Sequence, residues 1–173
     1  MRYLTNDERK CLLAALDARE QDMRDGRDSH ILWSKSRKLP LAPVMKDTEF
    51  ADHLKLIILL SLSTGIRRNT MFSLEWHDVN FTDKTIMVRA ATLKNDRLYY
   101  VPMNDLAFDT ISKWRRQCKH TSPGSLVFPS PQTGKIMDNC NTAWENLLER
   151  AGIENFRWHD MRHDFASQLV MKG

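Results

Sequence analysis

The strongest constraint on the fold is a run of apolar residues, LIILL at 56–60, inside a longer segment with helical periodicity. The segment, from about residue 48 to residue 63, is apolar around most of its circumference, which is typical of a helix buried on several sides. Gly65 follows Thr64 and can end a helix, because glycine adopts the left-handed backbone conformation without steric cost. We therefore predict a central core helix that stops at this glycine. Its predicted buried side chains are Phe50, Leu54, Ile57, Ile58 and Leu62.

The segments around this helix predict further helices and one small antiparallel sheet. Thr5 and Glu8 have the spacing of a capping box and start a helix that runs to about Arg19, while the polar stretch 21–38 is either a loop or a continuation of that helix. Strands at 85–90 and 98–102 are predicted to pair as an antiparallel hairpin. The predicted fold class is α+β, mainly α-helical, in a single domain that spans residues 1–173. The other predicted elements are a helix at about 69–74, a helix at about 106–119 with Leu106, Ile111 and Trp114 facing inward, a short buried strand at 126–128, a helix at about 141–151 capped by Asp138 or Asn139, and a last helix that begins in the stretch 157–164 and packs Phe165, Leu169 and Val170 inward.

Composition limits the classes of protein to which this chain can belong. A chain of 173 residues with 42% hydrophobic and 28% charged residues is typical of a globular domain, and its longest apolar run is too short to span a bilayer. The formal net charge of +4 is compatible with nucleic acid as a partner but does not require one. Three widely spaced cysteines fit neither a zinc site nor a disulfide framework. We therefore expect reduced thiols in a cytoplasmic protein that has no membrane partner.

Polar and charged residues gather in the octet RWHDMRHD at 157–164. If the octet is helical, His159 and Arg162 are three residues apart and lie on one face, where a histidine and a guanidinium together can grip a phosphate or a carboxylate. The alternative is a solvated helix start, in which Asp160 is favourable near the positive end of the helix dipole. Trp158 is expected to pack, and His163, which points to another face, is expected to be structural.

Two further basic residues give the octet a chemical context. Arg67 comes directly after the core helix, and Lys94 lies near the tip of the predicted hairpin. Taken singly, each is more often a solvated surface residue. Together with His159 and Arg162 they can serve a phosphodiester site, because arginines neutralise phosphate oxygens, a lysine can protonate a leaving oxygen and a histidine can move a proton. The sequence has neither a carboxylate cluster for magnesium nor a glycine-rich nucleotide loop, so we expect chemistry that uses no metal and no other cofactor.

These motifs, in this order and at this spacing, resemble those of the tyrosine recombinases (phage integrases) over nearly the whole chain. TGIRR at 64–68, followed by LEWHDV at 74–79, resembles the first arginine box of that family. TLKND at 92–96, before VPM at 101–103, resembles its β-hairpin lysine motif. WHDMRHDFAS at 158–167 resembles its HxxR box and is the strongest of the three matches. The resemblance implies the helical core of that catalytic domain with its small β-sheet.

The resemblance also implies a function, which is site-specific recombination or integration of double-stranded DNA. In the family pattern, Arg67 and Arg162 would clamp the scissile phosphate, Lys94 would act as the general acid for the leaving 5′ oxygen, and His159 would assist proton transfer. A tyrosine attacks phosphorus and forms a 3′-phosphotyrosyl link without ATP, metal or cofactor. Self-association on DNA is expected of a full-length protein, and an isolated fragment is expected to be monomeric.

The chain departs from the family pattern in two places. Family sequences continue past the HxxR helix to a Gly-His box and the nucleophilic tyrosine, whereas this chain stops at Gly173, and Tyr3, Tyr99 and Tyr100 do not match the nucleophile. Three positions after the first arginine the family usually has an acidic residue, and this chain has Thr70. We therefore expect a catalytic domain truncated before its nucleophile, which supplies the phosphate pocket but is inactive. The alternatives are a non-catalytic DNA-binding module of the same fold and an unrelated helical protein with a basic surface.

Overall fold

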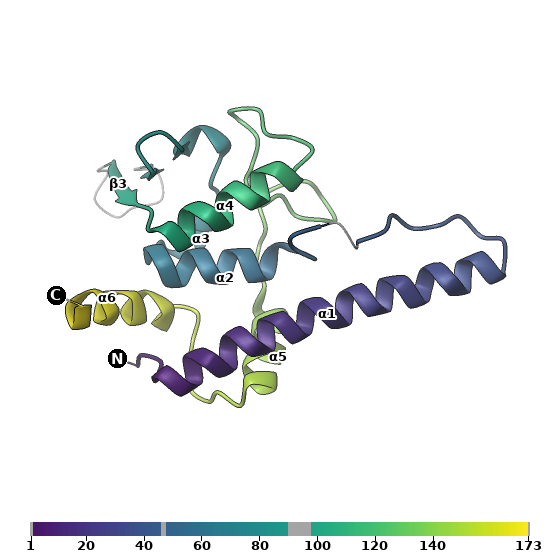
Figure 1. The fold of residues 1–173 in the computed structure, drawn as a ribbon. Coiled ribbons are helices and arrows are strands. Elements are labelled where there is room, and N and C mark those ends of the chain that lie inside the picture. Colours follow the sequence, from purple (N-terminus) through teal and green to yellow (C-terminus); the bar gives the residue numbers. More distant parts are fainter. Residues whose placement is uncertain (1, 46–47, 90–97, 173) are drawn as a thin grey trace.

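The structure, a computed structural model, describes residues 2–45, 48–89 and 98–172. It is mainly helical with a small antiparallel sheet, as the sequence predicted (Figure 1). In chain order the elements are α1 (Asn6–Ser36), α2 (His53–Thr64), α3 (Arg68–Phe72), the 3₁₀ turn η1 (Trp76–Asp78), β1 (Val79–Asn80), β2 (Thr85–Val88), β3 (Tyr99–Pro102), α4 (Asp105–Gln117), α5 (Asn141–Ala151) and α6 (Asp160–Lys172).

Helix α2 lies at the centre of the fold, between α4 on one side and α6 on the other (Figure 1). Its buried side chains belong to two hydrophobic clusters. Leu56 and Leu60 pack in the cluster that contains the sheet and α4, and Ile58 and Leu62 pack in the cluster that contains α1 and α5. Because α2 is buried on both of these faces, its sequence is apolar nearly all round. The prediction of a central core helix is therefore confirmed.

One helix boundary differs from the prediction, and a second decides between two alternatives that the sequence left open. Helix α2 begins at His53 rather than near residue 48, because the side chain of Asp52 accepts the backbone N–H of Leu54 at 2.9 Å and caps the helix there. Phe50, which precedes the helix, is nevertheless buried as predicted. Helix α1 runs on to Ser36, so the polar stretch 21–38 continues the first helix almost to its end.

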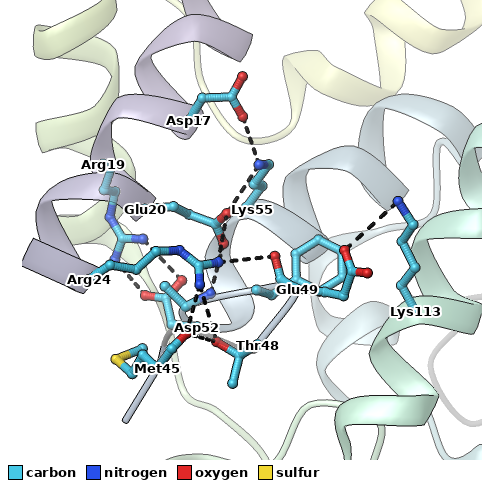
Figure 2. Close-up of polar contacts among 12 residues, drawn as sticks. Asp17, Arg19, Glu20, Arg24, Met45, Thr48, Glu49, Asp52, Lys55 and Lys113 are labelled. Carbon is cyan, nitrogen blue, oxygen red and sulfur yellow. Dashed lines mark hydrogen bonds and ion pairs between the residues drawn. The ribbon is translucent and has the colours of Figure 1, made fainter. Parts of the chain in front are cut away.

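A network of polar side chains holds the middle of α1 against the start of α2 (Figure 2). The carboxylate of Glu20 is 4% exposed; it accepts the backbone N–H of Ala51 at 2.9 Å and the ammonium of Lys55 at 3.1 Å. Arg19 donates two hydrogen bonds, at 3.0 and 2.5 Å, to the cap residue Asp52. These charge-assisted hydrogen bonds hold the part of α1 around Arg19 and Glu20 against α2, where the apolar periodicity of the sequence is weak.

The sheet has three antiparallel strands in the order β1-β2-β3. Strands β2 and β3 pair with Ile86 opposite Val101, so the predicted hairpin pairing is confirmed, and β1 is an addition that the sequence did not predict. The tip of the hairpin, residues 90–97 with Lys94, lies outside the described residues. In the segment 126–128, Val127 and Phe128 are buried as predicted and Leu126 is half-buried; the segment forms a single bridge, between Leu126 and Glu75, in place of a strand.

Three apolar side chains that were predicted to face inward are exposed. Leu106 is 54% exposed, Leu169 59% and Val170 83%. In α4 the buried face carries Ala107 and Ile111, and Leu106 is turned about 100° away from Ala107 on the helix. In α6 the inward face is largely polar, as described below, and Phe165 is the predicted apolar residue that makes an inward contact.

The described helices include none that is both long enough and apolar enough to cross a membrane. Cys11 is exposed, and Cys118 and Cys140 are half-buried. Burial raises the pKa of the Cys118 and Cys140 thiols to about 11, so both stay protonated at neutral pH.

Candidate phosphate-binding site

The position of Arg67 depends on the glycine that ends α2. Gly65 has a left-handed backbone (φ 62°), and a Cβ atom at this position would lie 2.5 Å from Cδ1 of Phe165. Glycine is thus required both by the backbone conformation and by the close approach of α6. Ile66 is then buried, and Arg67 takes an extended conformation as the cap residue of α3. This tight turn leaves the side chain of Arg67 exposed at the junction of two helices.

Arg162 reaches the same junction from α6. Its Nη1 donates a hydrogen bond of 2.7 Å to the carbonyl oxygen of Gly65, ninety-seven residues away in the chain. That carbonyl is among the last of α2 and has no partner within the helix, so the bond satisfies it and also orients the guanidinium. Arg162 is half-buried, and its other nitrogens make no hydrogen bond or ion pair with any described residue.

His159 lies in a turn immediately before α6 and not within the helix, where the sequence had placed it; its carbonyl oxygen accepts the backbone N–H of Arg162 at 3.2 Å. The turn is fixed by Asp160, which is 1% exposed and accepts the backbone N–H of Arg157 at 2.9 Å. Hydrogen bonds from the Arg157 guanidinium lower the pKa of Asp160, although burial of the carboxyl raises it. His159 is exposed, and its ring lies 5.2 Å from that of His163 in an edge-on arrangement.

These residues meet in one cleft of about 600 Å³ between α3, α5 and the turn before α6. Arg67, His159 and Arg162 all line it, so three of the four residues singled out in the sequence lie together. The fourth, Lys94, falls outside the described residues. Two lining residues that sequence reasoning did not single out are Arg68 and Asn141, which belongs to α5. Arg68 and Asn141 are joined by a hydrogen bond, and residue spacing could not have predicted it because the two residues are 73 positions apart.

The electrostatics of the cleft favour an anionic ligand. In the part of the chain that the structure describes, Arg67, Arg68 and Arg162 have no carboxylate partner, whereas Arg157 is paired with Asp160. Guanidinium groups without a counter-ion can bind phosphate through paired N–H donors. Within residues 2–45, 48–89 and 98–172, no group of three or more His, Cys, Asp or Glu side chains could hold a metal ion.

Several neighbouring residues have supporting or separate places. Trp158 packs edge-on against Trp144 and Phe72, with ring centroids 5.2 and 6.4 Å apart, so its predicted packing role is confirmed. Thr70 is buried and lines the cleft. All three tyrosines lie in the described part of the chain, and the cleft lining contains none of them. Tyr99 and Tyr100 line a different, largely apolar groove between β3 and α6.

The geometry agrees with comparisons to known proteins. The sequence profile described as the phage integrase family matches residues 41–173, and the chain therefore belongs to this family. It is 35% identical over 132 residues to the integrase of Salmonella phage P22, which covers 72% of this chain and 34% of that protein. It is 28% identical over 162 residues to the tyrosine recombinase XerA of Pyrococcus horikoshii, covering 86% of this chain and 55% of that protein.

Solved structures show the same fold. The crystal structure of XerA recombinase superposes with a TM-score of 0.65 at 21% identity, covering all of this chain and 52% of that one. The XerH site-specific recombinase bound to a palindromic difH substrate, in a post-cleavage complex, superposes with a TM-score of 0.62 at 19% identity and covers 98% of this chain and 42% of that one. The chain thus spans about half the length of the relatives that it matches, or less.

Proposed function

We propose that this chain binds a DNA phosphodiester in the cleft and serves site-specific strand cleavage and rejoining. The observation that carries this proposal is the meeting of Arg67 and Arg162 in one cleft without carboxylate partners among the described residues. Family membership supports it, since the phage integrase family implies site-specific DNA recombination. The Tn1549 transposon integrase, which superposes with a TM-score of 0.58 at 19% identity, is in complex with a circular intermediate DNA, and this supports DNA as the ligand.

In the proposed reaction the two arginines neutralise the non-bridging oxygens of the scissile phosphate, and this stabilises the charge of the pentacoordinate transition state. A tyrosine oxygen forms a bond to phosphorus while the bond from phosphorus to the 5′ oxygen breaks. Lys94 donates a proton to the leaving 5′ oxygen, and His159 assists transfer of the tyrosine proton. The 3′-phosphotyrosyl link conserves the bond energy, so the reverse steps rejoin DNA without ATP.

A second candidate function is a DNA-binding module that does no chemistry. The observation that favours it is Thr70, which lines the cleft at the position where the family usually has an acidic residue. Reading the coding region downstream of Gly173 separates the two proposals: a Gly-His box and then a tyrosine support a recombinase, and an immediate stop codon supports a module. On either account the 173 residues are expected to bind DNA.

Both proposals require that the chain binds DNA, and measuring DNA affinity as a function of salt concentration tests this. Binding of a labelled duplex, followed by fluorescence anisotropy, should weaken linearly on a log–log plot against salt concentration. Arg67→Gln and Arg162→Gln should each lower the steepness of that plot by about 1, as expected for loss of one phosphate contact. Arg150→Gln is the matched control, because Arg150 lies at the far end of α5 and pairs with Asp22. An affinity that does not respond to salt would refute the proposed function.

A further inference from the structure

The cleft is lined by a further arginine, Arg68, whose side chain is held in place by another element. Nη1 of Arg68, the first residue of α3, donates a hydrogen bond of 2.9 Å to the side-chain oxygen of Asn141, the first residue of α5. Both side chains line the cleft. The bond uses one of the five N–H donors of the guanidinium, and Arg68 has no carboxylate partner among the residues that the structure describes. Arg68 is therefore both oriented and still charged.

The start of α5 adds positive potential at this place. Its cap residue is Cys140 rather than the predicted Asp138 or Asn139. Cys140 makes no side-chain capping hydrogen bond, and the first turn contains no acidic residue. The side-chain oxygen of Asn139 accepts the N–H of Asn141 at 3.2 Å, so the N–H groups left for a ligand are the ones that follow it. Asn104, Asp52 and Thr5, in contrast, cap α4, α2 and α1 through their side chains. Burial raises the pKa of Cys140 to about 11 despite the nearby Arg68, so the thiol brings no negative charge of its own. A helix start without an acidic cap keeps N–H groups and a partial positive charge available to an anion.

The wall of the cleft also contains hydrogen-bonding groups that are not used. Ser61 is 2% exposed and Trp144 is 5% exposed. The hydroxyl of Ser61 and the indole Nε1 of Trp144 are both buried, and neither has a hydrogen-bond partner among the described residues. Ser63 and Thr64, on the same helix as Ser61, bond to carbonyl oxygens one turn back, at 2.5 and 2.6 Å. Ser61 does not, although both Ser61 and Trp144 line the cleft. Buried polar groups left unpaired are costly, and these two lie beside the cleft that the ligand would occupy.

We propose that Arg68, Asn141 and the first turn of α5 form a second phosphate subsite, which binds a neighbouring backbone phosphate of the same DNA strand whose scissile phosphate lies at Arg67 and Arg162. The inference rests on the proposed function and extends it. Arg67 has an extended backbone and an exposed side chain, whereas Arg68 is the first helical residue and bonds to Asn141, so we expect the two guanidinium groups to reach different phosphates. In this arrangement Arg68 binds the phosphate, and Asn141 is a positioning residue that acts through Arg68.

Salt-dependent DNA binding also tests the subsite. Arg68→Gln should lower the steepness of the log–log salt plot by about 1 and weaken binding at low salt, because one phosphate contact is lost. Glutamine keeps an N–H that can reach Asn141, and an unchanged melting temperature will verify that the variant folds. Asn141→Ala should weaken binding while the steepness stays that of the wild type, because the arginine remains charged but is less well oriented. In the Arg68→Gln background, Asn141→Ala should have no further effect on affinity.

Different results overturn the subsite and the proposed function. If Arg67→Gln lowers the steepness and Arg68→Gln does not, the second subsite is wrong and the phosphate cleft stands. If the control Arg150→Gln lowers it as much as Arg68→Gln, the effect is one of overall charge and the subsite is again wrong. Additive losses from Arg68→Gln and Asn141→Ala contradict the positioning role. If the wild-type protein shows no salt-sensitive binding to DNA, both the proposed function and the subsite fail.

Discussion

Replacing Gly65 with alanine is expected to damage both the fold and the cleft. The backbone at Gly65 is left-handed, which costs a residue with a side chain about 1–2 kcal/mol. The new Cβ would also lie 2.5 Å from the ring of Phe165, and overpacking of this kind costs about 1–3 kcal/mol. The two terms together predict a loss of about 2–5 kcal/mol in the free energy of unfolding.

The size of the chain converts this loss into a measurable shift. For a domain of 150–250 residues, each 1 kcal/mol lowers the melting temperature by about 2–4 °C, so Gly65→Ala should melt roughly 4–20 °C below the wild type. Circular dichroism or calorimetry measures the shift. Because the carbonyl of Gly65 holds Arg162 at 2.7 Å, the same variant should bind DNA more weakly even below its melting temperature.

The chain supplies two matched controls. Gly152 also has a left-handed backbone (φ 64°) but open space around its Cα, so Gly152→Ala should show the backbone term alone, about 1–2 kcal/mol. Gly26 is helical with nothing within 4 Å, and Gly26→Ala should stabilise the protein by about 0.5–1 kcal/mol. If Gly65→Ala melts at the same temperature as Gly152→Ala, the contact with Phe165 carries no cost and the reasoning is refuted.

Three further predictions concern buried or half-buried titratable groups. Glu20→Gln should lower the free energy of unfolding in urea by about 1–3 kcal/mol, because the charge opposite Lys55 is lost; an unchanged value would contradict the network of Figure 2. Burial lowers the pKa of His53 against the opposing effect of Asp52, so the unfolded chain takes up the proton first and stability should fall as pH drops below about 6.5. His53→Gln should flatten that dependence in denaturation curves measured from pH 8 to pH 5. In alkylation followed by mass spectrometry, Cys11 should react first, because burial raises the pKa of the other two thiols to about 11; simultaneous labelling of all three would count against this.

The sequence predicted the parts of the fold that depend on local pattern. The end of α2 at Gly65 and the limits of α5, residues 141–151, follow from apolar periodicity and terminating glycines. The exposure of Leu169 and Val170 could not be predicted in this way, because the buried face of α6 carries Asp160, Met161 and Asp164, two of which are acidic. A hydrophobic pattern cannot identify a face whose burial depends on hydrogen bonds to distant backbone.

In the candidate site, too, the sequence predicted what local motifs identify and missed contacts between distant segments. Arg67, His159 and Arg162 could be chosen from sequence because their motifs resemble a known family, and the structure brings them to one cleft. The hydrogen bond between Arg68 and Asn141 could not be predicted, because no local sequence rule relates two residues that are 73 positions apart. The place of His159 in a turn before α6 was not predicted either, because the turn depends on the buried side chain of Asp160.

The placement of Arg162 in the cleft follows from contacts that hold α6 on both sides. On one side, the buried carboxylate of Asp164 accepts the backbone N–H of Leu4 at 3.0 Å and pairs with Arg9, which ties α6 to the start of α1. On the other side, the ring of Phe165 fills the space that a side chain at residue 65 would occupy, and Arg162 bonds to the carbonyl there. The helix can therefore neither slide nor rotate without leaving a buried charge unpaired, which costs several kcal/mol. The guanidinium that is proposed to bind phosphate is thus positioned before any DNA arrives, and pre-organised charge of this kind stabilises a transition state most effectively.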